Sequence, residues 1–135
     1  AQSPKRPLLV GSSLGGYYAT YLAEQHGLRA VLLNPACQAA DLLSPWVGPQ
    51  TNLYTGEAFE LSPKHIQELR DLQIQSLSAP QKIWLLLETG DEVLDYRQAL
   101  RFYDGVRTTV VEGGSHELLS FPQFLPEIVA FQSQD

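Results

Sequence analysis

The chain has 135 residues, of which 44% are apolar, with a formal net charge of −6 and one cysteine. This length is sufficient for one domain with its own core, and a single cysteine excludes a disulfide framework. The acidic balance argues against nucleic acid as a partner, because binding phosphates needs a basic surface. No apolar run approaches the ~20 residues that cross a bilayer, so we also expect no membrane partner. Residues Ala1–Pro7 lack the apolar stretch of a signal peptide, and the cytoplasm is therefore the expected location.

The first 35 residues predict a strand, a helix and a second strand. Leu8–Val10 is a short apolar run, which is typical of a buried strand. Leu14–His26 has apolar residues at helical spacing, and Gly27 stands where a helix C-cap glycine belongs. Arg29–Leu33 is a second apolar run. A strand, helix and strand in succession imply that the two strands are parallel.

Residues 36–80 differ in character, because they are rich in proline and contain only short amphipathic pieces. We interpret them as an inserted cap segment over the C-terminal end of the sheet, too short for a core of its own. Ser62-Pro63 predicts the N-cap and first position of a helix that continues through Leu72. Three aromatic residues of the insertion could line an acyl pocket or anchor the insertion to the sheet, with neither role favoured: Trp46, Tyr54 and Phe59.

The rest of the chain repeats the alternation of strand and helix. Lys82–Glu88 and Arg107–Glu112 predict strands, while Asp95–Tyr103 and Phe121–Phe131 predict helices. Residues 1–135 therefore read as a single α/β domain with a mostly parallel sheet.

Gly11-Ser12-Ser13-Leu14-Gly15 fits the pattern Gly-x-Ser-x-Gly and lies between a predicted strand and a predicted helix. A serine at such a turn has a strained backbone and an exposed hydroxyl, so Ser13 is the candidate nucleophile. We expect Gly11 and Gly15 to give clearance, because side chains there would collide with the turn. The backbone N–H of Leu14, at the start of the helix, is the expected donor of an oxyanion hole.

Two other interpretations of this segment stay open. It could be a glycine-rich turn that only packs a strand on a helix, or it could bind phosphate. The phosphate interpretation lacks the lysine of a P-loop and the spacing of a dinucleotide fingerprint.

His116 is the candidate general base. It follows a predicted strand and the loop Gly113-Gly114-Ser115, at the C-terminal end of the sheet where Ser13 also lies. We expect His26 to cap carbonyls at a helix end and His65 to be a solvated surface residue.

Asp91 is the favoured acid, because it comes directly after a strand and a glycine turn. Asp95, Glu88 and Glu92 are the alternatives, and Asp95 also suits an N-cap position. The order Ser13, Asp91, His116 is that of α/β-hydrolases, whose chemistry needs no cofactor and no metal.

Cys37 follows another strand end, and we expect a small buried apolar residue there rather than a reactive thiol.

These motifs resemble the YqiA/YcfP group of small bacterial esterases. The resemblance implies a three-layer α/β-hydrolase fold and a carboxylesterase or acyl-thioesterase with Ser13 as nucleophile, Asp91 as acid and His116 as base. It also implies small-molecule acyl ester or thioester substrates of short to medium chain length, with acyl-CoA as one candidate. The segments that carry it are Val10–Thr20, Leu33–Ala36, Tyr54–Gly56, Thr89–Ala99 and Val111–His116.

The chain departs from that group ahead of the nucleophile. Members carry an earlier strand and a His-Gly-Phe loop that resembles the source of the second oxyanion donor, and no such loop precedes Ser13 here. The sequence therefore resembles an N-terminally truncated domain in which Leu8–Val10 has one bare side. We expect a second copy of the chain, a further segment or Ala1–Pro7 to cover that edge. The alternative function is a catalytically inactive hydrolase fold that acts as a binding or assembly module.

Overall fold

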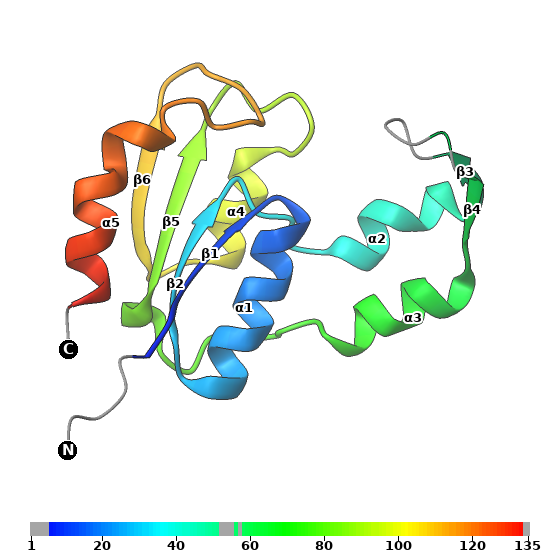
Figure 1. Ribbon diagram of the computed structural model, residues 1–135, viewed down its shortest axis with the longest axis horizontal. Coiled ribbons are helices and arrows are strands. Elements are labelled where there is room, and N and C mark those ends of the chain that lie inside the picture. Colours follow the sequence, from blue (N-terminus) through cyan, green and yellow to red (C-terminus); the bar gives the residue numbers. More distant parts are fainter. Residues whose placement is uncertain (1–5, 52–55, 57, 134–135) are drawn as a thin grey trace. The chain divides into compact units, whose positions relative to one another are not determined.

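The computed structural model describes residues 6–51, 56 and 58–133 (Figure 1). The chain divides into two compact units, and Gln38–Gln73 form the second. The first consists of Ala1–Cys37 together with Ile74–Asp135. All three proposed catalytic residues belong to the first unit. In the described part of the chain, no helix is both long enough and apolar enough to span a bilayer.

The first unit is built on a four-stranded sheet in the order β1-β2-β5-β6. Its strands are β1 (Leu8–Ser12), β2 (Arg29–Leu33), β5 (Ile83–Glu88) and β6 (Arg107–Val111). Every neighbouring pair is parallel, so the carboxyl ends of all four strands lie at the same edge. The turn that follows β1 and the loops that follow β5 and β6 therefore start from that one edge.

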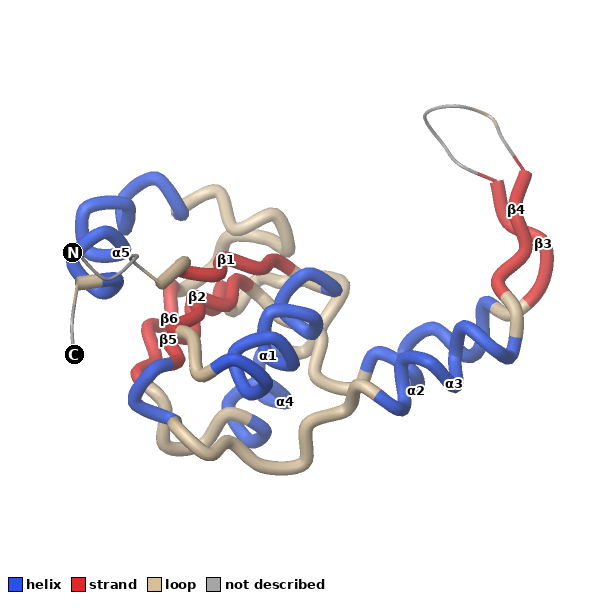
Figure 2. The backbone as a smooth tube through the Cα atoms, turned by 60° about the horizontal axis from the view of Figure 1, so that its bottom comes forward, coloured by secondary structure: helices blue, strands red, loops and turns tan. Residues whose placement is uncertain are grey.

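Helices cover both faces of this sheet (Figure 2). Helices α1 (Leu14–His26) and α4 (Tyr96–Phe102) lie on one face, and α5 (Leu125–Gln132) lies on the other. Strand residues alternate between two cores, since successive side chains of a strand point to opposite faces. One core joins Leu32 and Leu85 to Ala19 and Tyr103, and the other joins Val31 and Trp84 to Ile128 and Phe131. This arrangement confirms the expected three-layer α/β fold.

Most predicted elements coincide with observed ones. Helix α1 and strand β2 have the predicted bounds, and Gly27 adopts the left-handed conformation of a C-cap, with φ of 63°. The predicted helix over Phe121–Phe131 is different. It begins as a 3₁₀ turn, η3 (Phe121–Phe124), before α5 starts. Leu125, which was expected on the packed side, is 45% exposed, whereas Phe121, Phe124, Ile128 and Phe131 pack in the second core.

The second unit contains α2 (Ala39–Leu43), the antiparallel pair β3 (Gly48–Thr51) and β4 (Ala58–Leu61), and α3 (Pro63–Asp71). The predicted N-cap of α3 is confirmed, because the Ser62 side chain accepts the N–H of His65. The β3–β4 pair was not predicted, since prolines and short pieces gave no period-two pattern. The position of this unit over the sheet stays a prediction.

Candidate active site

Ser13 stands between the end of β1 and the first residue of α1 in a strained backbone conformation. Its φ is 56° and its ψ is −120°, a combination that L-residues rarely adopt. The end of β2 holds this conformation from both sides. The Ser13 N–H donates to the Leu33 carbonyl at 3.0 Å, and the Ala36 N–H donates to the Ser13 carbonyl at 2.9 Å. The strained strand-to-helix turn expected from Gly-x-Ser-x-Gly is therefore present.

Gly11 and Gly16 are the two positions near the turn where a side chain would collide, whereas the prediction was Gly11 and Gly15. A Cβ on Gly11 would lie 2.3 Å from the Gly15 carbonyl oxygen, so Gly11 is required as predicted. A Cβ on Gly15 would meet nothing within 4 Å, so the expected collision at Gly15 was wrong. The backbone of Gly15 crowds Gly11, while its own Cβ direction faces open space. The second crowded position is Gly16, where a Cβ would lie 2.6 Å from Cβ of Pro35.

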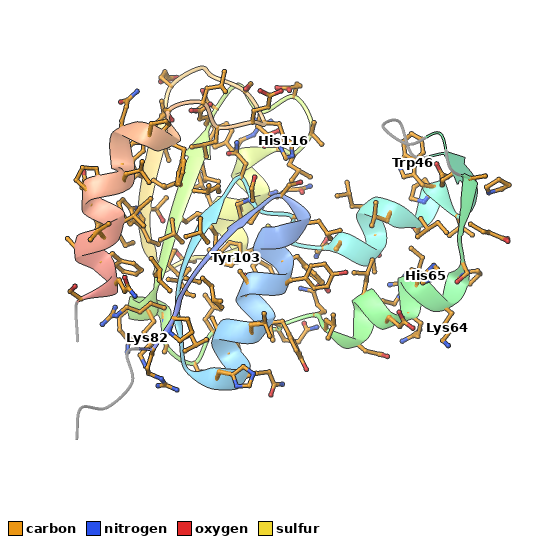
Figure 3. All side chains as sticks on the ribbon, viewed as in Figure 1. Trp46, Lys64, His65, Lys82, Tyr103 and His116 are labelled. Carbon is orange, nitrogen blue, oxygen red and sulfur yellow. The ribbon has the colours of Figure 1, made fainter. Side chains whose placement is uncertain are left out.

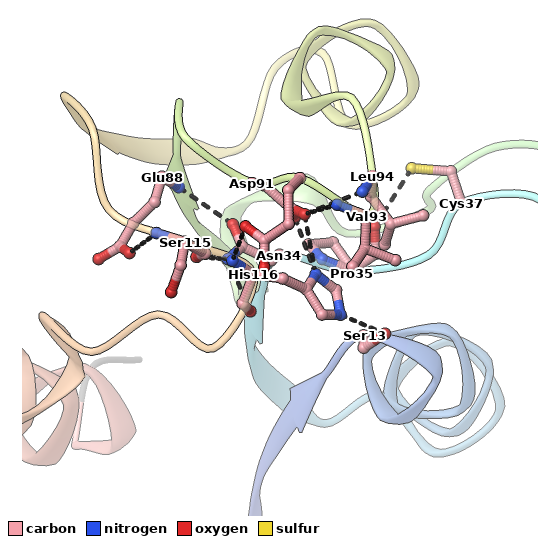
Figure 4. A network of polar contacts seen from close by, with 11 residues as sticks. Ser13, Asn34, Pro35, Cys37, Glu88, Asp91, Val93, Leu94, Ser115 and His116 are labelled. Carbon is pink, nitrogen blue, oxygen red and sulfur yellow. Dashed lines mark hydrogen bonds and ion pairs between the residues drawn. The ribbon is translucent and has the colours of Figure 1, made fainter.

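His116 bridges Ser13 and Asp91 (Figure 4). Its Nε2 lies 2.9 Å from the Ser13 hydroxyl oxygen. Its Nδ1 lies 2.9 Å and 3.0 Å from the two carboxylate oxygens of Asp91. Because an ionised carboxylate only accepts hydrogen bonds, Nδ1 carries the proton in the neutral imidazole and Nε2 accepts from the serine hydroxyl. The fold thus brings together the three residues that were predicted from the sequence as nucleophile, base and acid.

Asp91 is held by its own loop as well as by the imidazole. Its Oδ1 accepts the backbone N–H groups of Val93 at 2.9 Å and Leu94 at 2.8 Å. Its side chain is only 2% exposed, compared with 18% for His116. The preceding turn packs against the base loop, because a Cβ on Gly90 would lie 2.4 Å from the Gly114 carbonyl oxygen. The carboxylate therefore has little freedom to leave the ring.

The three alternative carboxylates have other partners. Glu92 accepts the backbone N–H of His116 at 3.2 Å rather than its ring. Asp95 caps α4, and its hydrogen bonds with Arg97 hold the pKa of Asp95 below its ordinary value. Glu88 binds the backbone N–H of Ser115 and is fully buried. Among the described residues, Asp91 alone places a carboxylate on the imidazole of His116.

The other residues that were considered from the sequence take no part in the hydrogen bonds that join Ser13, His116 and Asp91, where the structure describes their side chains. His65 lies in the second unit, where its Nδ1 accepts the N–H of Ser62 at 3.0 Å. Cys37 is 9% exposed, and burial raises the pKa of its thiol to about 11, as suits an unreactive thiol. Trp46 is 61% exposed. Tyr54 and the side chain of Phe59 lie outside the described residues, so both roles considered for these aromatic residues, lining an acyl pocket and anchoring the insertion, stay open.

The Leu14 N–H is the first amide of the 13-residue helix α1. No acceptor for it occurs among the residues that the structure describes. It adjoins Ser13 at the positive end of the helix dipole, the setting expected of an oxyanion donor.

A cavity of about 300 Å³ lies beside the acid loop and is lined by Thr89 and Asp91–Arg97. Neither Ser13 nor His116 lines it, so it is not the space where an acyl group would meet the serine. In the described ranges, no group of three or more His, Cys, Asp or Glu side chains is arranged to hold a metal ion.

A parallel sheet between helical layers, with a strained serine after a strand, defines the α/β-hydrolase fold. Solved structures of that fold resemble this chain. They include a putative hydrolase from Agrobacterium vitis S4, with a TM-score of 0.71 and 21% identity over 96% of this chain and 62% of the other. A monoacylglycerol lipase from Paleococcus ferrophilus has a TM-score of 0.65 and 17% identity, over 96% of this chain and 69% of the other.

The family model described as "Uncharacterised protein family (UPF0227)" matches residues 1–133. The chain therefore belongs to the UPF0227 family, which confirms the resemblance to the YqiA/YcfP group. A curated relative, UPF0227 protein Shewmr7_1806 from Shewanella sp. (strain MR-7), is 28% identical over 130 residues. That match covers 93% of this chain, and the chain spans 65% of the length of the relative.

Proposed function

We propose that the chain is a serine hydrolase that cleaves carboxylic esters or thioesters through an acyl-enzyme. Ser13 is the nucleophile, His116 the general base and Asp91 the acid that orients the base. The observation that supports this role is the unbroken line of hydrogen bonds from the Ser13 hydroxyl through both nitrogens of His116 to Asp91. The strained backbone of Ser13 also supports the nucleophile role, because strain of this kind persists only where the surrounding structure enforces it.

Acylation begins when the Ser13 hydroxyl attacks the ester carbonyl and its proton moves to Nε2 of His116. The negative charge of Asp91 stabilises the imidazolium that forms and keeps the ring in one tautomer. The oxyanion of the tetrahedral intermediate accepts the Leu14 N–H at the start of α1. His116 then returns the proton to the departing alcohol or thiol, and the acyl group stays on Ser13.

Deacylation repeats these steps with water as the nucleophile. His116 takes a proton from the water as it attacks the acyl-enzyme, and the acid leaves when Ser13 regains its proton. The substrates that we propose are acyl esters and thioesters of short to medium chain length. Rates with p-nitrophenyl esters of increasing acyl length test this range, and the longest esters should be the poorest substrates.

The decisive experiment compares the purified chain with Ser13→Ala on p-nitrophenyl butyrate. We expect the substitution to lower kcat by about 10⁶-fold, since the remaining groups cannot replace a nucleophile. Ser12→Ala is the matched control, because this neighbouring serine is exposed and its hydroxyl takes no part in the hydrogen bonds that join Ser13, His116 and Asp91, so kcat should stay unchanged. A fluorophosphonate probe should label the wild type and Ser12→Ala, but not Ser13→Ala.

One observation favours the second candidate, an inactive hydrolase fold that acts as a binding or assembly module. Strand β1 pairs only with β2 in the described sheet, so one of its edges offers backbone groups to another chain. Equal hydrolysis by the wild type and Ser13→Ala, with no labelling of Ser13, would favour the module over the enzyme.

A further inference from the structure

Asn34 is a buried polar residue that has no part in the proposed chemistry. It follows the last residue of β2, is 2% exposed and has a φ of 43°, which is uncommon for a residue other than glycine. Its backbone N–H donates to the Leu86 carbonyl on the neighbouring strand β5 at 3.0 Å. A buried asparagine in this conformation indicates that its side chain has a specific task.

The side-chain amide of Asn34 joins β5 to the loop of the base (Figure 4). Its Nδ2 donates to the carbonyl oxygens of Ser115 at 3.0 Å and His116 at 3.1 Å. Its Oδ1 accepts the backbone N–H of Glu88 at 3.0 Å. Two acceptors on one side and a donor on the other fix which end of the amide is nitrogen. No other side chain of this size offers two donors and an acceptor in that arrangement.

The nucleophile is held by the same short segment. The Leu33 carbonyl accepts the Ser13 N–H, and the Ala36 N–H donates to the Ser13 carbonyl. Residues 33–36 therefore bind the serine turn through their backbone and the His116 loop through the Asn34 side chain. The distance between Ser13 and His116 is set across this one segment.

Glu88 fixes the other side of the loop. Its carboxylate accepts the Ser115 N–H at 2.9 Å, the Ser120 N–H at 3.3 Å and a short hydrogen bond from the Ser120 hydroxyl. Burial acts to raise the pKa of Glu88, but these hydrogen bonds outweigh that effect and hold the pKa below its ordinary value. The backbone of this loop also passes close to Glu88, because a Cβ at Gly114 would overlap the Glu88 carboxylate. The backbone on both sides of His116 is thus tied to β5.

We propose that Asn34 is a positioning residue, whose two donated hydrogen bonds hold the His116 backbone so that the imidazole reaches Ser13 and Asp91 together. This inference rests on the proposed function. A displacement of about 1 Å between reacting groups can cost about 100-fold in rate, so the loss of this support should reduce kcat more than KM.

Asn34→Asp is the first test, since it keeps the shape and the acceptor for Glu88 but removes both donated hydrogen bonds. Tyr103→Phe is the matched control. It removes a buried hydrogen bond of 2.8 Å to Thr20 in the interior of the same unit. Figure 3 labels Tyr103 and His116, and Tyr103 lies away from His116. Four quantities are measured for each variant: kcat and KM for p-nitrophenyl butyrate, the melting temperature, and the downfield proton resonance of His116 Nδ1–H by NMR.

We expect Asn34→Asp to lower kcat by about 10- to 100-fold with little change in KM, and to shift or broaden the Nδ1–H resonance. Tyr103→Phe should lower the melting temperature but keep kcat and the resonance. If Asn34→Asp does not fold, Asn34→Gly replaces it, because glycine tolerates the φ of 43° at this position and also removes both donated hydrogen bonds, so it should show the same pattern.

A folded Asn34→Asp with wild-type kcat and an unchanged resonance overturns the positioning role. A fall in kcat that Tyr103→Phe reproduces at equal loss of melting temperature also overturns it. The resonance is measured without turnover. If the wild type proves inactive, the proposed function fails on the ester assay, while the resonance of Asn34→Asp still decides whether the amide holds the imidazole.

Discussion

Gly11 and Gly15 occupy equivalent places in the serine motif, yet the structure predicts opposite results for replacing them with alanine. The Cβ of Gly11→Ala would lie 2.3 Å from the Gly15 carbonyl oxygen and 2.6 Å from its carbonyl carbon. Both contacts are with backbone, which cannot rotate away as a side chain could. The Cβ of Gly15→Ala would meet no atom within 4 Å.

The two substitutions should therefore differ in sign. Forcing a methyl group against backbone costs about 3 kcal/mol, at the upper end for overpacking. Gly15 lies inside α1 with ordinary backbone angles, so alanine there should stabilise the helix by about 0.5–1 kcal/mol. For 135 residues, 1 kcal/mol corresponds to a change in melting temperature of about 3–4 °C. We expect Gly11→Ala to melt about 10 °C below the wild type and Gly15→Ala about 2–3 °C above it.

Differential scanning calorimetry on the two variants and the wild type measures these shifts directly. Gly16→Ala serves as a positive control for crowding, since its Cβ would lie 2.6 Å from Cβ of Pro35. Destabilisation of Gly15→Ala equal to that of Gly11→Ala would refute the reasoning, because it would mean that the motif needs its second glycine for clearance after all.

Four further results are expected. Asp91→Asn should keep the fold but lower kcat by about 10⁴-fold in the ester assay, because an amide does not hold the imidazole in the required tautomer, whereas Asp95→Asn should retain activity. Cys37 should react with a disulfide reagent at pH 8 only after denaturant is added; rapid labelling of the folded chain would contradict its raised pKa and burial. Folding lowers the pKa of Glu88, so the ionised carboxylate stabilises the folded state. This contribution is complete at pH values above the pKa of Glu in the unfolded chain, about 4.3, and is lost as the pH falls through the lower pKa of the folded state. Urea denaturation between pH 6 and 3 should show this loss, and Glu88→Gln should lack that part of the pH dependence. We expect a second copy or a further segment to cover the edge of β1 (Leu8–Ser12); a well-behaved monomer in sedimentation, with fast amide exchange along this strand, would reject that expectation.

The amino-acid sequence alone predicted the parts of this protein that depend on near neighbours. Apolar runs, helical spacing and cap residues are local signals, so α1, β2 and the cap at Ser62 fell where they were predicted. The serine motif was recognisable for the same reason, since the strained turn at Ser13 is formed within a few residues. The β3–β4 pair and the 3₁₀ start of α5 were missed, because their residues carry no clear period.

The tertiary structure decided which side chains meet. Four carboxylates between residues 88 and 95 were candidates for the acid, and Asp91 is the one on the imidazole because its loop packs against Gly114. The contact between Ser13 and His116 joins residues 103 apart in the chain. The sequence placed no emphasis on the side chain of Asn34, which lies 81 residues from the Ser115 carbonyl that it binds. Contacts of this range depend on how strands are ordered in the sheet, and a local pattern of residues does not contain that order.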